Sequence, residues 1–426
     1  MIRKLGASLK QHSNEGFLYP AYKDNCISNI PGTLLDLFGV KNRLSKLPIK
    51  INNWFDNTDK IVLFVLDGFG YNQFSHFYEE HKFLANLAEK GDVFPLTSVF
   101  PSQTTNALTT LNTGLTPQEH GLFEYYLYLK EVDMIVNTLR FEPLGSTHRD
   151  ELLEKGFNPN LLFRGTTILN KLEEEDIKTF VHIHIAYAYS QYSSIIFKGS
   201  NIVPALKSSD LIVKLRKSLE NEKGPAYFFV HLSNLDTIAH EYGPKSYEFS
   251  AELSMICYLL RRELVEKIDQ KSAKETLFLM ISDHGEVNIA PDKITYLNQF
   301  PKIMENLQYG KRGKQIFPTG SPRDVFLHVK KEKLEDTQEL LSQKVGEKAK
   351  IIETNEAIKS GLFGKGSVRQ EFSDRVGNLL ILPYRNETIW FEHFIGRKFC
   401  LLGHHGGLTD DEMLVPLAIT NLNDLK

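Results

Sequence analysis

The chain has 426 residues, of which 42% are hydrophobic and 24% are charged, the balance of an ordinary globular protein. Its 50 lysines and arginines face 53 aspartates and glutamates, which leaves a net charge of −3. This balance gives no signature of a nucleic-acid partner or of binding to an anionic membrane. A small polyanion bound through metal ions would need no net positive charge, so the composition is compatible with a small-molecule partner.

The N-terminal residues and the apolar runs predict the location of the chain. The basic N-terminus lacks the apolar core and the small-residue cleavage site of a secretory signal. No apolar run approaches the ~20 residues that a membrane-spanning helix needs. The three cysteines, Cys26, Cys257 and Cys400, are too widely spaced for a disulfide framework or a CxxC zinc site. We therefore expect a cytoplasmic protein without a membrane span, whose oligomeric state the sequence leaves open.

The first part of the chain is expected to be a lead-in followed by a buried strand. Residues 1–58 would pack on the core, with a short capped helix over residues 30–38. Ile61–Leu66 then form a continuous apolar run that ends at Asp67 and Gly68. A run of this length without alternation predicts a strand buried on both faces, as in a parallel sheet.

Two later runs repeat this design. Tyr227–Leu232 leads towards Asp236, and Leu277–Ser282 ends at Asp283. Apolar residues at helical spacing lie between these runs, over Ser246–Asp269. Alternating strands and helices predict an α/β three-layer sandwich with a mostly parallel central sheet flanked by helices. Ligands bind beyond the carboxyl ends of such strands, so acids at three of these ends predict a functional site.

Residues 290–398 are richer in Lys, Gln and Glu and are expected to form a smaller α+β cap inserted into the main domain. A βαβ-like passage runs from Asp324–Val329 through a helix near Glu335–Val345 to Ile351 and Ile352. The catalytic core is accordingly expected over residues 59–289 and 399–426.

Four short motifs place acidic and imidazole side chains just past strands or in glycine-flanked turns. They are Asp67-Gly68, Asp236 with His240 four residues later, Asp283-His284, and His404-His405 between glycines. Each motif alone also fits a turn, a helix cap or a surface contact. Together, three aspartates and three histidines match two mixed nitrogen and oxygen metal sites. This ligand mix favours Zn²⁺, with Mn²⁺ next.

A hydroxyl-rich segment supplies a candidate nucleophile. Residues 100–111 run from a proline-bounded loop into a predicted helix, with Ser102 and Thr104 near its start. Either hydroxyl could simply cap the helix. A helix N-terminus also favours an anionic oxygen, as in-line displacement at phosphorus between two metal ions requires.

The order of these motifs resembles the alkaline phosphatase superfamily, specifically the type I phosphodiesterase/nucleotide pyrophosphatase family. The six matching segments, in chain order, are residues 67–68, 100–104, 113–121, 236–244, 282–285 and 405–408. The resemblance implies an alkaline phosphatase-like fold and a metal-dependent hydrolase of phosphoric esters. The bonds it implies as substrates are phosphodiester or pyrophosphate bonds.

The resemblance also implies roles for individual residues. Thr104 would be the nucleophile and would form a phosphothreonine intermediate, with retention of configuration at phosphorus after two in-line steps. One metal ion would be held by Asp236, His240 and His405, and the other by Asp67, Asp283, His284 and the Thr104 oxygen. His405 is preferred over His404 because the family histidine directly precedes the glycine pair. His120 falls in a family segment with a structural role.

The chain departs from nucleotide pyrophosphatases near the expected substrate. Substrate contacts are implied at Asn106 and at Tyr125, which takes the place of an asparagine that holds a non-bridging oxygen. Tyr125 would either donate its hydroxyl to the same oxygen or simply pack. Thr105 replaces an aromatic residue that helps to sandwich a base, and His231 stands where its partner aromatic is expected. These changes weaken nucleotide specificity and leave phosphomonoesterase, phosphonate hydrolase or phosphotransferase activity open at the same site. A catalytically idle, partner-binding member of the fold is the non-enzyme alternative.

Other residues are expected to be structural. His182 and His184 share one face of a predicted strand and are interpreted as satisfied histidines. Arg323 is expected on the surface, with contact to a substrate's anionic end as the alternative. The following aromatic residues predict a buried strand or, alternatively, a leaving-group pocket: Phe123, Tyr125, Tyr126 and Tyr128.

Overall fold

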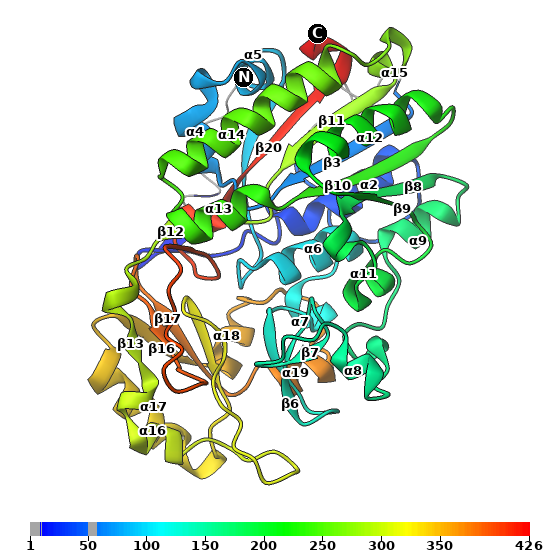
Figure 1. Ribbon diagram of the computed structural model, residues 1–426. Helices are drawn as coiled ribbons and strands as arrows, with labels where there is room; N and C mark the ends of the chain where they lie inside the picture. The colour runs from blue at the N-terminus through cyan, green and yellow to red at the C-terminus, as the bar shows by residue number, and fades with distance from the viewer. Residues whose placement is uncertain (1–8, 10, 50–57) are drawn as a thin grey trace.

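A seven-stranded sheet forms the centre of the computed structural model, which describes residues 9, 11–49 and 58–426 (Figure 1). The expected lead-in over residues 1–58 therefore lies partly outside the described residues. From one edge to the other, the strands are β4 (Asp92–Thr97), β20 (Leu414–Asn421), β11 (Thr276–Ile281), β3 (Lys60–Leu66), β10 (Ala226–Leu232), β8 (Lys178–His184) and β9 (Asn201–Ala205). Within this sheet, β20 runs in the opposite direction to the other six strands.

The three apolar runs become the three adjacent central strands. Every residue of β3, β10 and β11 is buried, as expected for strands covered on both faces. β3 pairs in parallel with β10 on one side and with β11 on the other, and Leu66 lies opposite Leu232. The carboxyl ends of these strands consequently meet at one edge of the sheet.

Helices cover both faces of the sheet. On one face, α5 (Lys82–Lys90) and α12 (Ser208–Asn221) contact α14 (Tyr247–Leu259). On the other face, α2 (Ile30–Leu37), α6 (Thr104–Thr113) and α9 (Ile168–Glu173) contact one another. After Leu259, the expected long helix continues as a π-helical turn over Leu260–Val265. The predicted three-layer α/β architecture is confirmed.

The segment after residue 290 builds a second sheet below the first in Figure 1. Its antiparallel strands, in order, are β14 (Thr319–Ser321), β15 (Asp324–Leu327), β17 (Leu379–Pro383) and β16 (Ala349–Glu353). Helix α17 (Leu334–Val345) links β15 to β16, so the expected βαβ-like passage is present with β17 inserted between its two strands. A separate apolar core includes Val325, Leu327, Leu341, Val345 and Ile381.

Residues 117–165 leave the central sheet and pack against this cap (Figure 1). They hold α7 (Pro117–His120), α8 (Glu151–Glu154) and a small sheet of β5 (Tyr126–Leu129), β6 (Met134–Asn137) and β7 (Glu142–Pro143). The Phe123 ring lies 5.3 Å from Phe326 and 5.0 Å from Phe372. Buried Arg375 donates to the carbonyls of Gly121, Leu161 and Leu162. Residues 117–165 and the cap, which are far apart in the sequence, thus pack together.

Arg323 corrects a prediction, because it lies in the interior rather than on the surface. Its Nε and one Nη each donate to Glu412 at 2.9 Å, and both side chains are fully buried. Further donations go to the carbonyls of Arg385 and Glu387. Burial alone would raise the pKa of Glu412, but the Arg323 charge outweighs it and holds that pKa below its ordinary value. The pair connects the cap strand β15 to the segment that precedes β20.

The other side chains interpreted as structural have partners. His182 Nε2 lies 3.1 Å from Ser218 Oγ, and His184 Nε2 lies 3.0 Å from the Leu206 carbonyl.

Cys26 and Cys257 are buried, whereas Cys400 is exposed, and none of the three forms a disulfide within the described residues. Among helices of the described ranges, none combines the length and apolar character needed to cross a bilayer.

Replacing Arg323 tests the energetic role of the buried pair. We expect Arg323→Met to lower the free energy of unfolding by about 3–5 kcal/mol, because it leaves the Glu412 carboxylate buried without its cation. The control is Arg262→Met, whose partner Glu266 lies 3.8 Å away on the surface. That exposed pair should contribute less than about 1 kcal/mol. Equal urea-unfolding curves for the two variants would contradict the assignment.

Candidate active site

The acidic motifs converge because their strands are neighbours. Asp67 directly follows β3, and Asp283 and His284 follow β11 after one residue. Asp236 lies in the first turn of α13 (Asn234–Tyr242), the helix that follows β10. The Gly68 amide donates to Asp283 Oδ1 at 3.2 Å, which ties the first two loops together. The edge of the parallel sheet therefore assembles side chains that are more than 200 residues apart in sequence.

A second set of contacts joins the His405 loop to residues 100–103, the loop before the predicted nucleophile (the nucleophile loop). His405 Nδ1 lies 2.9 Å from the Ser102 carbonyl, and Ser102 Oγ donates to the Gly407 carbonyl at 2.9 Å. Gly406 has φ = +119°, and a Cβ there would lie 2.5 Å from Gln103 Nε2. This position therefore requires glycine both for its backbone conformation and for the close approach of the two loops.

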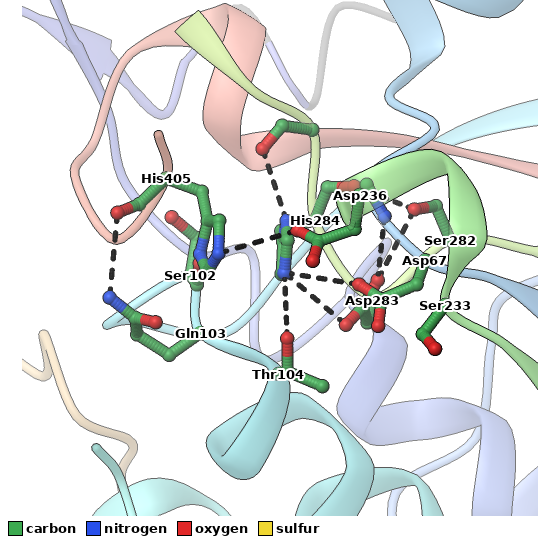
Figure 2. Close-up of polar contacts among 12 residues, drawn as sticks. Asp67, Ser102, Gln103, Thr104, Ser233, Asp236, Ser282, Asp283, His284 and His405 are labelled. Atoms are coloured by element: carbon green, nitrogen blue, oxygen red, sulfur yellow. Dashed lines mark hydrogen bonds and ion pairs between the residues drawn. The ribbon is translucent and has the colours of Figure 1, made fainter. Parts of the chain in front are cut away.

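Thr104 is the first residue of α6 and faces this assembly (Figure 2). Its Oγ lies 3.1 Å from His284 Nε2. The free N–H groups and the dipole at the start of a helix favour an anionic oxygen at this position. Ser102, the alternative hydroxyl, is fully buried and engaged with the glycine loop, so Thr104 is the one that lines the cavity.

The six predicted ligands form two clusters. In the first, His240 Nε2 and His405 Nε2 lie 3.4 and 3.6 Å from Asp236 Oδ1. In the second, His284 Nε2 lies 3.4 Å from Asp67 Oδ1 and 3.3 Å from Asp283 Oδ2. The His284 and His405 rings stack with 3.6 Å between centroids, which places the clusters side by side (Figure 2).

Backbone carbonyls determine which imidazole nitrogen faces the clusters. The Nδ1 atoms of His240, His284 and His405 lie 2.8, 3.2 and 2.9 Å from the carbonyls of Gly403, Gly285 and Ser102. A carbonyl can only accept, so each Nδ1 carries a proton, and in the neutral ring each Nε2 has its lone pair available. All three lone pairs consequently belong to nitrogens that lie near carboxylates, the arrangement of metal-binding histidines.

The carboxylates lack enough donors. Asp67 Oδ1, Asp236 Oδ1 and Asp283 Oδ2 are buried and accept no hydrogen bond from the described part of the chain. Burial raises the pKa of Asp67 well above its ordinary value, and the charges of Asp283 and Asp236 raise it further. Burial alone would also raise the pKa of Asp283, but His284 and His231 outweigh it and lower that pKa. Bound cations would relieve this accumulation of negative charge.

His231 has a role that the sequence interpretation missed. Its ring is buried, and its Nε2 lies 2.9 Å from Asp67 Oδ2. The imidazole therefore orients a predicted metal ligand in addition to lining the cavity. The signal was its position at the carboxyl end of β10, directly beside the end of β3.

The two predicted substrate contacts differ in their location. Tyr125 lines the cavity, and burial raises the pKa of its hydroxyl, which stays protonated and able to donate. Asn106 is fully buried, donates to the Pro101 carbonyl at 2.7 Å and does not line the cavity, because its side chain turns into the nucleophile loop. His120 is buried beside Thr110, and burial lowers its pKa to about 3, in keeping with a structural role.

A cavity of about 620 Å³ opens next to Thr104 and both clusters. One wall comes from residues 117–165 and includes Tyr125 and Tyr126. Another comes from residues 389–401, a segment we call the strap, which includes Phe394 and Phe399. The four aromatic residues of this run therefore separate into two groups. Tyr125 and Tyr126 line the pocket, whereas Phe123 and Tyr128 are buried away from it.

Comparison with known proteins identifies the family. The sequence matches the model of the type I phosphodiesterase / nucleotide pyrophosphatase family over residues 61–407, so the chain belongs to that family. The predicted resemblance is confirmed. The matched residues span both central clusters, the nucleophile loop and the cap.

Individual relatives are distant. Venom phosphodiesterase CdcPDE of Crotalus durissus collilineatus is 25% identical over 54% of this chain and 26% of its own length. An uncharacterised pyrophosphatase/phosphodiesterase of Schizosaccharomyces pombe is 23% identical over 58% of this chain and 48% of its own length. The alignments thus span about half or less of these relatives.

Solved structures share the fold. Murine ectonucleotide pyrophosphatase / phosphodiesterase 5 is 15% identical with a TM-score of 0.61, covering 85% of this chain and 88% of that one. Its human counterpart is also 15% identical, with a TM-score of 0.61 and coverage of 85% and 87%.

The His231 contact generates a testable prediction about the second cluster. We expect His231→Phe to weaken divalent-metal binding at Asp67 by about tenfold, because the carboxylate loses the imidazole that orients it. Competition with a chelating dye would measure the change. His182→Phe, which alters a buried histidine bonded to Ser218, is the control and should leave metal affinity unchanged. Equal affinities for both variants and the unmodified protein would refute the role of His231.

Proposed function

We propose that the protein is a metal-dependent hydrolase of phosphoric esters, acting on phosphodiester or pyrophosphate bonds with Thr104 as nucleophile. The observation that carries this proposal is the position of Thr104. Its hydroxyl lies at the N-terminus of α6, 3.1 Å from His284 and beside two carboxylate–imidazole clusters. Membership of the phosphodiesterase / nucleotide pyrophosphatase family supports the same reaction class.

The donor atoms fit two divalent cations. One would be held by Asp236, His240 and His405, and the other by Asp67, Asp283, His284 and Thr104. The unpartnered carboxylate oxygens and the three Nε2 lone pairs support this assignment. Such a mixture of oxygen and imidazole ligands favours Zn²⁺, with Mn²⁺ next. When bound, the cations would stabilise charge on the phosphoryl oxygens and lower the pKa of the attacking hydroxyl.

The side chains and helix of this chain then perform two displacements. Thr104 loses its hydroxyl proton to solvent and Oγ bonds to phosphorus while the bond from phosphorus to the leaving oxygen breaks; the leaving oxygen takes up a proton, and a phosphothreonine remains. Free N–H groups in the first turn of α6 stabilise the non-bridging oxygens. Water next attacks phosphorus, and the bond to Thr104 Oγ breaks. Each step inverts phosphorus, so the complete reaction proceeds with retention of configuration.

The cavity supports a substrate with a sizeable apolar or aromatic group beyond the phosphoryl centre. An inactive variant of the murine structural relative is described in complex with AMP, which makes nucleotides reasonable probes. In this chain, however, Thr105 cannot stack on a base and His231 is bonded to Asp67. Aromatic contact would come instead from Tyr125, Tyr126 and the strap. We therefore favour a diester or pyrophosphate without strict specificity for the base.

Removing the nucleophile tests the mechanism. Thr104→Ala should lower turnover of bis(4-nitrophenyl) phosphate by about a thousandfold or more, because no hydroxyl remains to attack phosphorus. Thr104→Ser keeps that hydroxyl and should retain measurable turnover. Metal analysis should find the same cation content in both variants within experimental error. Full turnover by Thr104→Ala, or a reconstituted unmodified protein that binds no metal, would overturn the proposal.

The strap residue Phe394 tests the substrate class. Its side chain lines the cavity and is 41% exposed, so truncation should cost little stability. We expect Phe394→Ala to raise KM roughly three- to tenfold for the bis(4-nitrophenyl) diester, which loses an aromatic contact. KM for 4-nitrophenyl phosphate should change less. The adjacent Ile395 is fully exposed and does not line the cavity, so Ile395→Ala is the matched control. Faster hydrolysis of the monoester than of the diester would favour a phosphomonoesterase instead.

A further inference from the structure

Glu286 is an acidic side chain in the interior to which no role has yet been assigned. It lies two residues after His284, immediately before the short strand β12 (Val287–Asn288). The side chain is 2% exposed, and neither carboxyl oxygen accepts a hydrogen bond from a donor in residues 9, 11–49 or 58–426. A buried carboxyl group without any donor is costly, so its retention calls for a compensating partner.

The position of Glu286 points to the first cluster. One of its oxygens lies within 4.8 Å of ligand atoms of both Asp236 and His240, close enough for the three to hold one cation. Strand β12 pairs with β19 (Gly403–His404), which brings Glu286 next to the loop that carries His405. The carboxyl group thus approaches the first cluster from the loop that supplies Asp283 and His284 to the second cluster.

Two glycines make room for this carboxyl group. A Cβ at Gly68 would lie 2.8 Å from Glu286 Oε1, and a Cβ at Gly403 would lie 2.6 Å from Oε2. Gly68 follows the ligand Asp67, and the Gly403 carbonyl accepts from the ligand His240. The loops of both clusters therefore approach the Glu286 carboxyl group closely and enclose it.

The charges around Glu286 favour a cation. The charged neighbours that act most strongly on it are Asp236, Asp283 and Glu412, all acids. Glu412, in contrast, is bonded to Arg323 at 2.9 Å. Asp236 Oδ1 also lacks a hydrogen-bond donor within the described residues; the His240 and His405 imidazoles lie 3.4 and 3.6 Å away, so the two carboxyl groups have at most a partial counter-charge. A divalent ion next to both would supply it.

We infer that Glu286 supplies a carboxylate oxygen to the cation held by Asp236 and His240. This inference rests on the proposed metal-dependent function and extends it, because the first site gains a second carboxylate. An oxygen-richer ligand set favours harder cations, so this site should accept Mn²⁺ more readily than one with a single carboxylate. Each site would then have two carboxylates, because the second site already contains Asp67 and Asp283.

The test compares metal affinity and thermal stability in three variants. Glu286→Gln removes the charge at constant shape, and Glu286→Met also removes the polar atoms. Glu252→Gln is the matched control. Glu252 lies on α14, and its Oε1 accepts no hydrogen bond within the described residues. Burial raises the pKa of its carboxyl group, as it does for Glu286. Zn²⁺ and Mn²⁺ are titrated separately against a chelating dye, and melting is followed with EDTA and with each metal.

We expect both Glu286 variants to bind one of the two metal ions about ten- to a hundredfold more weakly, with the larger loss for Mn²⁺. Without metal, Glu286→Met should melt at a higher temperature than the unmodified protein, because an uncompensated polar group has been removed. Its melting temperature should also rise less than that of the unmodified protein when metal is added. If the carboxyl group were merely structural, Glu286→Met would melt at a lower temperature than the unmodified protein in EDTA.

Two results would overturn the inference while leaving the proposed function intact. The first is unmodified affinity for both metals in Glu286→Gln and Glu286→Met. The second is full affinity in Glu286→Gln with a loss only in Glu286→Met, which would make residue 286 a hydrogen-bond partner of Asp236 and not a ligand. Failure of the unmodified protein to bind metal would instead refute the proposed function itself.

Discussion

The site depends on negative charge gathered where parallel strands end. β3, β10 and β11 lie side by side, and the loops or helix after them bring three aspartates together at one edge. Their oxygens are buried and several accept no hydrogen bond within the described residues, so the folded chain holds a concentration of charge that costs free energy unless cations offset it. Three imidazoles with Nδ1 bonded to backbone carbonyls complete the donor set. The proposed metal binding would therefore be coupled to folding.

The rest of the structure holds the loops around this charge. Strand β20 returns antiparallel between β4 and β11, after the chain has passed through the cap and the His405 loop. Ser102 bonds to that loop through both its carbonyl and its hydroxyl, which sets Thr104 at the start of α6 against His284. The buried Arg323–Glu412 pair connects the cap to the residues before β20. The cap and residues 117–165 then enclose the space in which a leaving group would lie.

Local sequence patterns predicted much of this arrangement. The features that they missed depend on contacts between residues far apart in the sequence. Continuous apolar runs ending in Asp67 and Asp283 were sufficient to predict buried parallel strands and a site at their ends. Arg323 was wrongly expected on the surface, because its partner Glu412 lies 89 residues away and no local pattern announces the pairing. His231 was noted only as the replacement of a base-stacking aromatic residue, since its bond to Asp67 depends on the register between β10 and β3. Glu286 likewise becomes notable only when Asp236, Gly68 and Gly403 surround it.

Anomalous X-ray diffraction from crystals grown with Zn²⁺ tests the central claim most directly, because it locates the cations without reference to activity. The account predicts two strong peaks at the zinc edge. One should lie among Asp236, His240 and His405, and the other among Asp67, Asp283 and His284 next to Thr104 Oγ. A single peak, or peaks remote from both clusters in a fully loaded crystal, would contradict the two-metal site and the mechanism built on it.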